Sequence, residues 1–208
     1  STRLITAGGI VDGKISGDLV VQGAGDPNIS GRFHEDDPLA IFTAWADKLK
    51  KLGLREISGN LIADDSFFDN VRFLEGWNPK DRGKWFSAQI SPLSLNDNCV
   101  EIRVVPGAVG KLARVSVFPA NPFVTVSGAP KTVSGKKVVV VVSNPGEGNK
   151  VTVKGSIGAS AGTWRGNLPI DDPALFFAHT LATVLKKQGI KIGGDVVRVG
   201  GKEVPGGG

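Results

Sequence analysis

The stretch DDPLAIFTAWADKLKKLGLREISGNLIAD, residues 36–64, returns near the end of the chain as DDPALFFAHTLATVLKKQGIKIGGDVVRVG, residues 171–200. Each copy contains two aspartates and a proline, an apolar stripe at helical spacing, two lysines, a glycine and a strand-like run. The aspartates and proline favour a helix start, and the glycine favours its end. A repeated helix-strand unit separated by unlike sequence is typical of one domain interrupted by an insertion.

The sequence between the two units is rich in β-branched residues and in turn residues. Strand-like runs occur at residues 99–105, 112–117, 123–126, 138–142 and 151–153, separated by Gly, Pro and Asn. This pattern favours a small β-sandwich or barrel. The sequence therefore predicts an α+β fold, in which residues 1–105 and 163–208 form a discontinuous inserted domain and residues 106–162 form a nested all-β subdomain.

The N-terminal part is expected to add further strands to the α+β domain. Residues 3–6 and 18–22 have strand-like composition, and Asp12-Gly13 is typical of a hairpin turn. Because an inserted domain must return to the point where its host is interrupted, we expect Ser1 and Val204–Gly208 to lie close together on one side.

Composition excludes several classes of protein. The 208 residues include no long apolar run, which is typical of a soluble globular chain of one or two domains. The net charge of +5 is not gathered in one segment, so nucleic acid is not an expected partner. The single Cys99 excludes an internal disulfide and a zinc site built from cysteines alone. No cofactor is expected.

Two acidic clusters could suggest a metal ion, but each has a simpler interpretation. Asp36 and Asp37, near His34, are expected to cap the first helix. Asp64-Asp65-Ser66 is typical of a turn after a strand, and His179 is expected to lie away from the apolar stripe of its helix. We therefore expect no metal site.

Three short segments partly match the motifs of serine-type penicillin-recognising enzymes: Ser94-Leu95-Asn96, Ser134–Lys137 and Lys131–Val133. Ser134 cannot begin the helix that Ser-x-x-Lys chemistry needs, because a glycine and a run of valines follow it. Residues 134–137 are expected to form a hairpin turn instead. Lys131–Val133 ends in valine where the motif requires glycine. No catalytic residue is therefore expected in this chain.

Four segments in order carry a resemblance to a known family: ISGDLVVQGAGDPNIS, GNLIADDSFF, EGWNPKDRGKWFSAQISPLSLNDNCVEI and NLPIDDPALFFAHTL. They resemble the inserted domains of class C low-molecular-mass penicillin-binding proteins, the D-alanyl-D-alanine carboxypeptidases and endopeptidases of the bacterial cell envelope. The resemblance implies that the Ser-x-x-Lys helix precedes this region and that the Ser-x-Asn and Lys-Thr-Gly motifs follow it. Under that expectation the chain alone is inactive, and Ser94 and Asn96 are not catalytic.

The resemblance also implies a substrate-binding role for Asp81 and Phe86. In the family, an acidic residue after a Gly-Trp motif meets the side-chain ammonium of a diaminopimelate-type stem peptide. Gly76-Trp77 matches that motif, Asp81 follows it, and Phe86 is expected to provide an apolar wall. The alternative is that Asp81 forms a surface ion pair with the adjacent Arg82.

Two functions therefore remain open. The first is a non-catalytic inserted region of a serine-type D-Ala-D-Ala carboxypeptidase or endopeptidase, whose partner is the peptidoglycan stem peptide bound through a catalytic domain. The second is a stand-alone module that binds a cell-wall polymer. The resemblance implies the periplasm or cell envelope, and the sequence itself contains no transmembrane segment and no signal peptide. It does not distinguish carboxypeptidase from endopeptidase preference.

Overall fold

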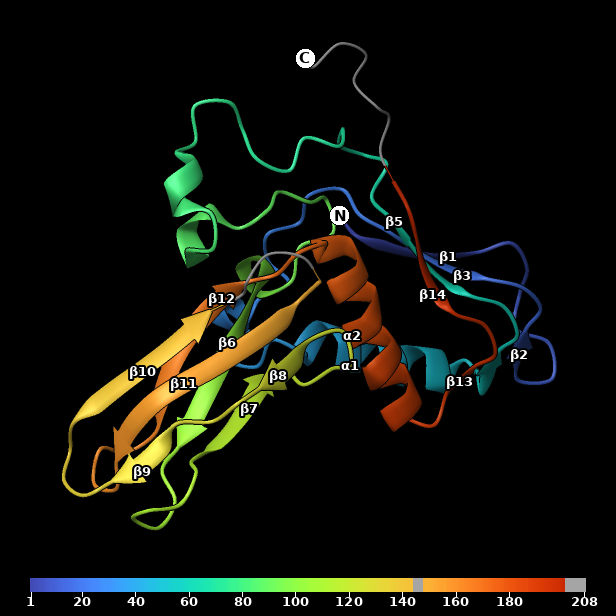
Figure 1. The fold of residues 1–208 in the computed structure, drawn as a ribbon. Coiled ribbons are helices and arrows are strands. Elements are labelled where there is room, and N and C mark those ends of the chain that lie inside the picture. The colour runs from blue at the N-terminus through green and yellow to red at the C-terminus, as the bar shows by residue number, and fades with distance from the viewer. Residues whose placement is uncertain (144–147, 201–208) are drawn as a thin grey trace.

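The computed structural model describes residues 1–143 and 148–200 (Figure 1). Helices α1 (Ala40–Lys51) and α2 (Pro173–Lys187) lie with seven strands in one part of the molecule. These strands form two sheets, in the orders β1-β3-β5-β14 and β13-β4-β2. Their bounds are β1 (Arg3–Thr6), β2 (Lys14–Ile15), β3 (Leu19–Gln22), β4 (Glu56–Ile57), β5 (Leu61–Asp64), β13 (Lys191–Ile192) and β14 (Val196–Val199).

The remaining strands form an elongated β region (Figure 1). One sheet has the order β12-β6-β7, and another has the order β10-β11-β8, with β9 also pairing with β11. Their bounds are β6 (Cys99–Val105), β7 (Arg114–Phe118), β8 (Thr125–Ser127), β9 (Lys131–Val133), β10 (Val138–Ser143), β11 (Lys150–Gly158) and β12 (Trp164–Pro169). Short 3-10 turns occur at η1 (Gly31–Phe33), η2 (Pro79–Asp81), η3 (Trp85–Ser87) and η4 (Asn96–Asn98).

The mixed helices and sheets agree with the predicted α+β class. Both predicted helix-strand units are present, and the turn at Asp12-Gly13 joins residues 11 and 14, which pair as a bridge. β7 lies inside the predicted subdomain 106–162, whereas its partner β6 and the next strand of that sheet, β12, lie outside it. The division of the chain into an inserted domain and a nested subdomain stays a prediction.

The start of α1 differs from the sequence expectation. The helix begins at Ala40, and its N-cap residue Leu39 has no side-chain oxygen to accept a hydrogen bond. Asp37 instead accepts from the Leu39 N–H at 2.8 Å, in the turn before the helix. The prediction that Asp36 and Asp37 cap this helix is therefore wrong. In α2 the equivalent Asp172 does cap the helix, because its Oδ1 accepts from a first-turn N–H at 3.0 Å.

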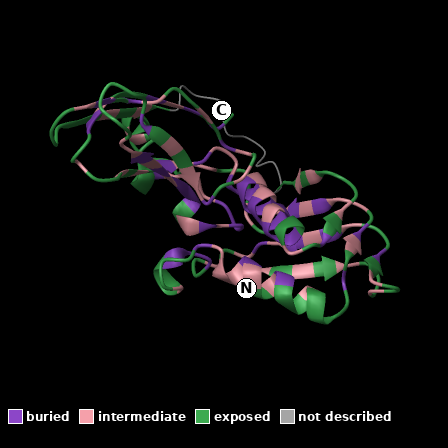
Figure 2. Ribbon diagram, turned by 90° about the horizontal axis from the view of Figure 1, so that it is seen from below, coloured by how far each residue is buried: buried purple, intermediate pink, exposed green. Residues whose placement is uncertain are grey.

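The two helices pack on each other through aromatic side chains. The ring of Phe42 in α1 meets that of Phe177 in α2 edge to face, with centroids 4.7 Å apart. Trp45 contacts both rings at 5.6 and 6.3 Å. Buried residues are concentrated along α2 and the strands beside it (Figure 2). The predicted apolar stripes of the two repeated helices therefore face each other in the core.

The strands of the two repeats pair with each other, and a third copy joins them. The segments ISGDLVVQ (15–22), ISGNLIAD (57–64) and IGGDVVRV (192–199) each form a short strand, a glycine corner and a longer strand. β2 and β13 both pair in parallel with β4, and β3 and β14 both pair in parallel with β5. The first copy does not stand out in the sequence, because a hairpin and not a helix precedes it.

The glycine corners stack through direct backbone contact. The Gly59 N–H donates to the Gly17 carbonyl, and the Gly194 N–H donates to the Gly59 carbonyl, both at 2.8 Å. A Cβ atom on Gly59 would lie 2.7 Å from the Gly17 carbonyl oxygen, and one on Gly194 would lie 2.8 Å from the Gly59 carbonyl carbon. Any side chain at these positions would therefore push the strands apart.

The residue after each corner glycine adds a polar ladder. The Asn60 N–H donates to Asp18 Oδ1 at 2.6 Å, and the Asp195 N–H donates to Asn60 Oδ1 at 2.9 Å. Each polar side chain thus accepts a hydrogen bond from the backbone N–H of the next corner. A shift of one strand pair by a single residue would break these bonds. The ladder therefore specifies the register of the three strand pairs.

The prediction that the chain ends lie close together stays a prediction, because Val204–Gly208 lie outside the described residues. β1 pairs antiparallel with β3, and the following pairs are parallel, so Arg3, Gln22, Asp64 and Val199 form one row across the sheet. The first residue of β1 and the last residue of β14 therefore lie at the same end of the sheet, on its two opposite edge strands.

We predict that Gly59→Ala lowers the free energy of unfolding by about 1–3 kcal/mol, because the added methyl group would overlap the Gly17 backbone. Urea denaturation followed by circular dichroism measures the change. Gly9→Ala is the matched control, since nothing lies within 4 Å of a Cβ at that position. Equal stability of the two variants would show that the corner contact is not required.

Candidate functional site

A buried ion pair holds together the two ends of a long loop, residues 73–89. Asp65, directly after β5, has a fully buried carboxylate whose Oδ2 lies 2.5 Å from Arg72 Nη2 and 3.0 Å from Arg198 Nε. Arg72 also donates to the Ile90 carbonyl at 3.1 Å, and the Ile90 N–H donates back to the Arg72 carbonyl at 2.9 Å. The loop therefore starts and ends at one fixed point on the α+β part.

The structure brings the two predicted substrate-binding residues to one lysine. Asp81 Oδ1 lies 2.6 Å from Lys84 Nζ, and the same Nζ lies 5.6 Å from the centroid of the Phe86 ring. The alternative ion pair of Asp81 with Arg82 is not the one formed, because Arg82 places its guanidinium 4.6 Å from the Phe73 ring. A carboxylate and an aromatic face thus surround an ammonium group on the surface of the loop.

Residues 94–98 have a structural role in the described part of the chain. Asn96, Asp97 and Asn98 all have φ between 51° and 57°, which turns the chain sharply into β6. The buried Asn98 accepts from the Leu95 N–H at 3.3 Å and donates to the Gln89 carbonyl at 2.9 Å. The polar side chains of this segment therefore stabilise a left-handed turn, for which Asn and Asp are suited.

The other two motif-like segments also lie in β structure. Lys131–Val133 is the strand β9, and residues 134–137 connect it to β10. The expectation of a hairpin turn at 134–137 is wrong, because β9 and β10 do not pair with each other. Both pair with β11, β9 in parallel and β10 antiparallel. Residues 134–137 therefore cross from one side of β11 to the other.

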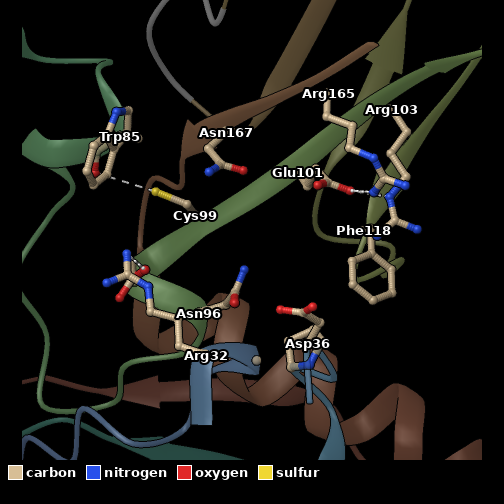
Figure 3. A pocket seen from close by; sticks show the side chains of 13 residues that line it. Arg32, Asp36, Trp85, Asn96, Cys99, Glu101, Arg103, Phe118, Arg165 and Asn167 are labelled. Atoms are coloured by element: carbon tan, nitrogen blue, oxygen red, sulfur yellow. Dashed lines mark hydrogen bonds and ion pairs between the residues drawn. The ribbon is translucent and has the colours of Figure 1, made fainter. Parts of the chain in front are cut away.

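A polar cleft of about 540 Å³ opens between the β12-β6-β7 sheet and the turns η1 and η4 (Figure 3). The sheet contributes one of its faces, since residues of β6 and β12 alternate between core and cleft. Val100, Ile102 and Val104 point into the core, whereas the alternate residues line the cleft. The lining side chains from the sheet are Cys99, Glu101, Arg103, Phe118, Arg165 and Asn167.

Strand register brings the charged groups of this face together. Arg165 of β12 stands opposite Arg103 of β6, and Asn167 stands opposite Glu101. Glu101 Oε1 accepts from Arg165 Nη1 at 2.8 Å and also from Arg103 Nε. The Arg103 guanidinium lies 3.9 Å from the ring centroid of Phe118 on β7. The sheet wall of the cleft is therefore an ordered network, with one carboxylate shared by two guanidinium groups.

Turns contribute the opposite wall and one end of the cleft. Arg32 of η1 forms an ion pair with Asp97 of η4 at 2.6 Å, and Asp36 and Asn96 lie nearby. The Trp85 side chain, half exposed, stands at one end (Figure 3). Burial raises the pKa of the Cys99 thiol to about 12, so this thiol remains protonated and is not a nucleophile at neutral pH.

This cleft was not predicted from the sequence, although the sequence contains a signal for it. Glu101 and Arg103 alternate with valine and isoleucine in β6, and Arg165 and Asn167 occupy alternate positions in β12. That alternation could have indicated two strands with one polar face. It could not have shown that the strands are neighbours, because 60 or more residues separate the paired positions.

Residues 1–143 and 148–200 contain no group of three or more His, Cys, Asp or Glu side chains placed to hold a metal ion. His179 is half buried and stacks on Phe123, with ring centroids 5.0 Å apart, and burial lowers its pKa. Within the same residues, no helix has the length and apolar character needed to cross a membrane.

Comparison with known proteins agrees with the resemblance seen in the sequence. Residues 1–205 match the model of the D-Ala-D-Ala carboxypeptidase 3 (S13) family. The chain is 31% identical over 186 residues to a D-alanyl-D-alanine carboxypeptidase of Actinomadura sp. (strain R39), covering 86% of this chain and 33% of that protein. It is 25% identical over 202 residues to D-alanyl-D-alanine carboxypeptidase DacB of Haemophilus influenzae, covering 94% of this chain and 40% of that protein.

A solved structure has a similar fold. The crystal structure of penicillin binding protein 4 (dacB) from Haemophilus influenzae superposes with a TM-score of 0.70 at 23% identity, covering 95% of this chain and 42% of that one. The chain thus spans about a third to two fifths of the length of the relatives that it matches. On the extent of the family match and the agreement of the fold, the chain belongs to the D-Ala-D-Ala carboxypeptidase 3 (S13) family.

Proposed function

We propose that this chain is a non-catalytic inserted region of a serine-type D-Ala-D-Ala carboxypeptidase or endopeptidase, and that it helps to shape the cleft for peptidoglycan stem peptides. The observation that supports this role is the group formed by Asp81, Lys84 and Phe86. A carboxylate at 2.6 Å and an aromatic ring at 5.6 Å already surround one ammonium group. The same two side chains suit the ammonium and methylene stem of a diaminopimelate-type residue.

In this proposal Lys84 holds the place of the substrate ammonium when no substrate is bound. The ion pair is solvent-exposed, with 54% of the Lys84 side chain and 30% of the Asp81 side chain accessible. Exposed ion pairs of this kind contribute only about 0–1 kcal/mol, so the substrate can displace Lys84 at little cost. The buried Asp65 ion pair fixes only the ends of the loop, which leaves this group free to contact another domain.

The alternative function is a stand-alone module that binds a cell-wall polymer without chemistry. The polar cleft beside the β12-β6-β7 sheet favours it, because that cleft is built from this chain alone. The complete protein decides between the two functions. A Ser-x-x-Lys motif before this region, with Ser-x-Asn and Lys-Thr-Gly motifs after it, supports the enzyme, and their absence supports the stand-alone module.

The partners and location follow from the same proposal. The stem peptide binds through a catalytic domain, and the protein acts in the periplasm or cell envelope, where peptidoglycan lies. D-alanyl-D-alanine carboxypeptidase is the activity that both curated relatives carry in their names. Nucleic acid is not among the proposed partners, since the arginines of the cleft are balanced there by carboxylates.

We predict that Asp81→Asn in the complete enzyme lowers kcat/KM on diaminopimelate-type peptides about tenfold to a hundredfold. The variant keeps the shape of the side chain and removes its charge, and hydrogen bonds to charged groups contribute about 1.5–3 kcal/mol. A peptide with an uncharged side chain at that position should be cleaved equally by both proteins. Steady-state kinetics on the two peptides gives the comparison.

Asp69→Asn is the matched control, because Asp69 is an exposed residue before the same loop and accepts a local backbone bond from the Val71 N–H. It should change neither peptide's kcat/KM. Equal losses for Asp81→Asn on both peptides would indicate a structural role, and no loss on either would return Asp81 to a surface ion pair with Lys84.

We predict the opposite sign for Lys84→Gln. Removing this ammonium leaves Asp81 unpaired, so substrate no longer has to displace an ion pair of up to about 1 kcal/mol, and kcat/KM should rise by up to about fivefold. The increase should be confined to the diaminopimelate-type peptide. A decrease as large as that of Asp81→Asn would mean that Lys84 itself assists the substrate.

We predict that the 208-residue chain forms no covalent adduct with a fluorescent penicillin. Acylation needs a serine hydroxyl with a base partner, and within residues 1–143 and 148–200 no serine hydroxyl is hydrogen-bonded to a lysine or histidine. Gel electrophoresis after labelling is the measurement, with an intact family carboxypeptidase as positive control. A labelled band that disappears in Ser94→Ala would contradict the prediction.

A further inference from the structure

The cleft beside the β12-β6-β7 sheet has the size and composition of a ligand site, and nothing in the proposed role of Asp81 and Phe86 uses it. Its volume of about 540 Å³ lies within the range of small-molecule pockets. It is built from segments far apart in the sequence: η1, η3, η4 and three strands of one sheet (Figure 3). Ion pairs within the cleft hold several of its side chains in place.

Charge in the cleft is balanced, which argues against a polyanionic ligand. The three guanidinium groups that line it, Arg32, Arg103 and Arg165, are matched by three carboxylates, Asp36, Asp97 and Glu101. Each arginine already has a carboxylate partner within the cleft. An anion would have to compete with these partners, and a cation at Asp97 or Glu101 would have to compete with the arginines.

The paired groups still offer many hydrogen bonds to a neutral ligand. A guanidinium has five N–H donors, and each of these arginines uses only part of its set on a carboxylate. A carboxylate likewise keeps free lone pairs, and Asn96 and Asn167 add amide donors and acceptors. Guanidinium donors beside carboxylate and amide acceptors suit hydroxyl groups, because each hydroxyl both donates and accepts.

An aromatic side chain supplies the apolar component. Trp85 lines the cleft and is 52% exposed. Its indole therefore leaves a large apolar surface in contact with water when no ligand covers it. The C–H groups on the face of a sugar ring form an apolar surface of matching size. The indole can therefore contact the C–H face of a sugar ring, while the polar side chains of the cleft bind its hydroxyl groups.

We propose that this cleft binds an uncharged saccharide chain, with one ring against Trp85 and with hydroxyl groups on the Glu101–Arg165 network. The inference stands apart from the proposed role of Asp81 and Phe86, since it concerns different side chains and needs no catalytic domain. A cell-wall glycan and a storage-type glucan share the required chemistry. The linkage of the sugars distinguishes these two sources in the experiment.

The test is a titration of the 208-residue chain with a β-linked tetrasaccharide of N-acetylglucosamine and with maltotetraose, followed by isothermal calorimetry and tryptophan fluorescence. An acidic tetrapeptide at the same concentrations is the probe for anion binding. We expect saccharide binding and no peptide binding. Trp85→Ala should weaken saccharide binding about fivefold to tenfold, in line with the loss of one aromatic contact. Binding of the β-linked sugar alone would identify the cell-wall source.

Arg165→Gln should weaken saccharide binding by a similar factor, since it removes donors at the sheet wall. Trp77→Ala and Arg114→Gln are the matched controls, because both residues are exposed and lie outside the cleft lining, and they should leave binding unchanged. Circular dichroism checks that each variant is folded. Asn167→Ala, an exposed position in the cleft, replaces any variant that fails this check.

Three results would overturn the proposal. The first is no saccharide binding by the unchanged chain. The second is binding that survives Trp85→Ala, Arg165→Gln and Asn167→Ala without loss, which would place the saccharide elsewhere. The third is tighter binding of the acidic peptide than of either saccharide, lost in Arg165→Gln, which would identify the cleft as an anion site.

Discussion

Direct backbone contact between the corners at Gly17, Gly59 and Gly194 is the constraint on which the α+β part depends. At 2.8 Å between amide nitrogen and carbonyl oxygen, no side chain fits between successive corners. The polar ladder after the glycines adds bonds of about 0.5–1.5 kcal/mol each, which are modest singly but strongly dependent on register. Once the corners are stacked, the three longer strands end at one level, with Asp64 opposite Val199.

Because the three strands end at the same level, the position of the buried Asp65 carboxylate is determined as well. The residue follows the end of β5, and Arg198 of β14 reaches it from the neighbouring strand at 3.0 Å. Its other oxygen, Oδ1, is buried with no hydrogen-bond partner among the described residues, so the two arginines alone offset the desolvation of this charge there. Arg72 then ties the loop ends to the same carboxylate. The position of the loop that carries Asp81 and Phe86 thus depends on the register of β5 and β14, through the ion pairs of Asp65.

In the β region, the β12-β6-β7 sheet has one face in the core and the other face in the polar cleft. Val100, Ile102 and Val104 join the common buried cluster with Val151, Val153 and Ile157 of β11, so the two β sheets share a core of sandwich type. The opposite face of β6 cannot be apolar as well, because the turns η1 and η4 leave an open cleft there. Its charged residues are satisfied by pairing across strands, which produces an ordered polar wall instead of a loose charged surface.

The sequence by itself determined the α+β class, the two helix-strand units and most strand positions, because periodicity and turn residues act locally. It also carried the family resemblance, and it indicated Asp81 and Phe86 through that resemblance. Tertiary structure alone decided which strands pair, and hence that residues 15–22 form a third repeat and that 134–137 cross over β11. It also decided the partner of Asp81 and the meeting of Glu101 with Arg165, 64 residues apart. Pairing depends on contacts between distant residues, and local propensity contains no information about them.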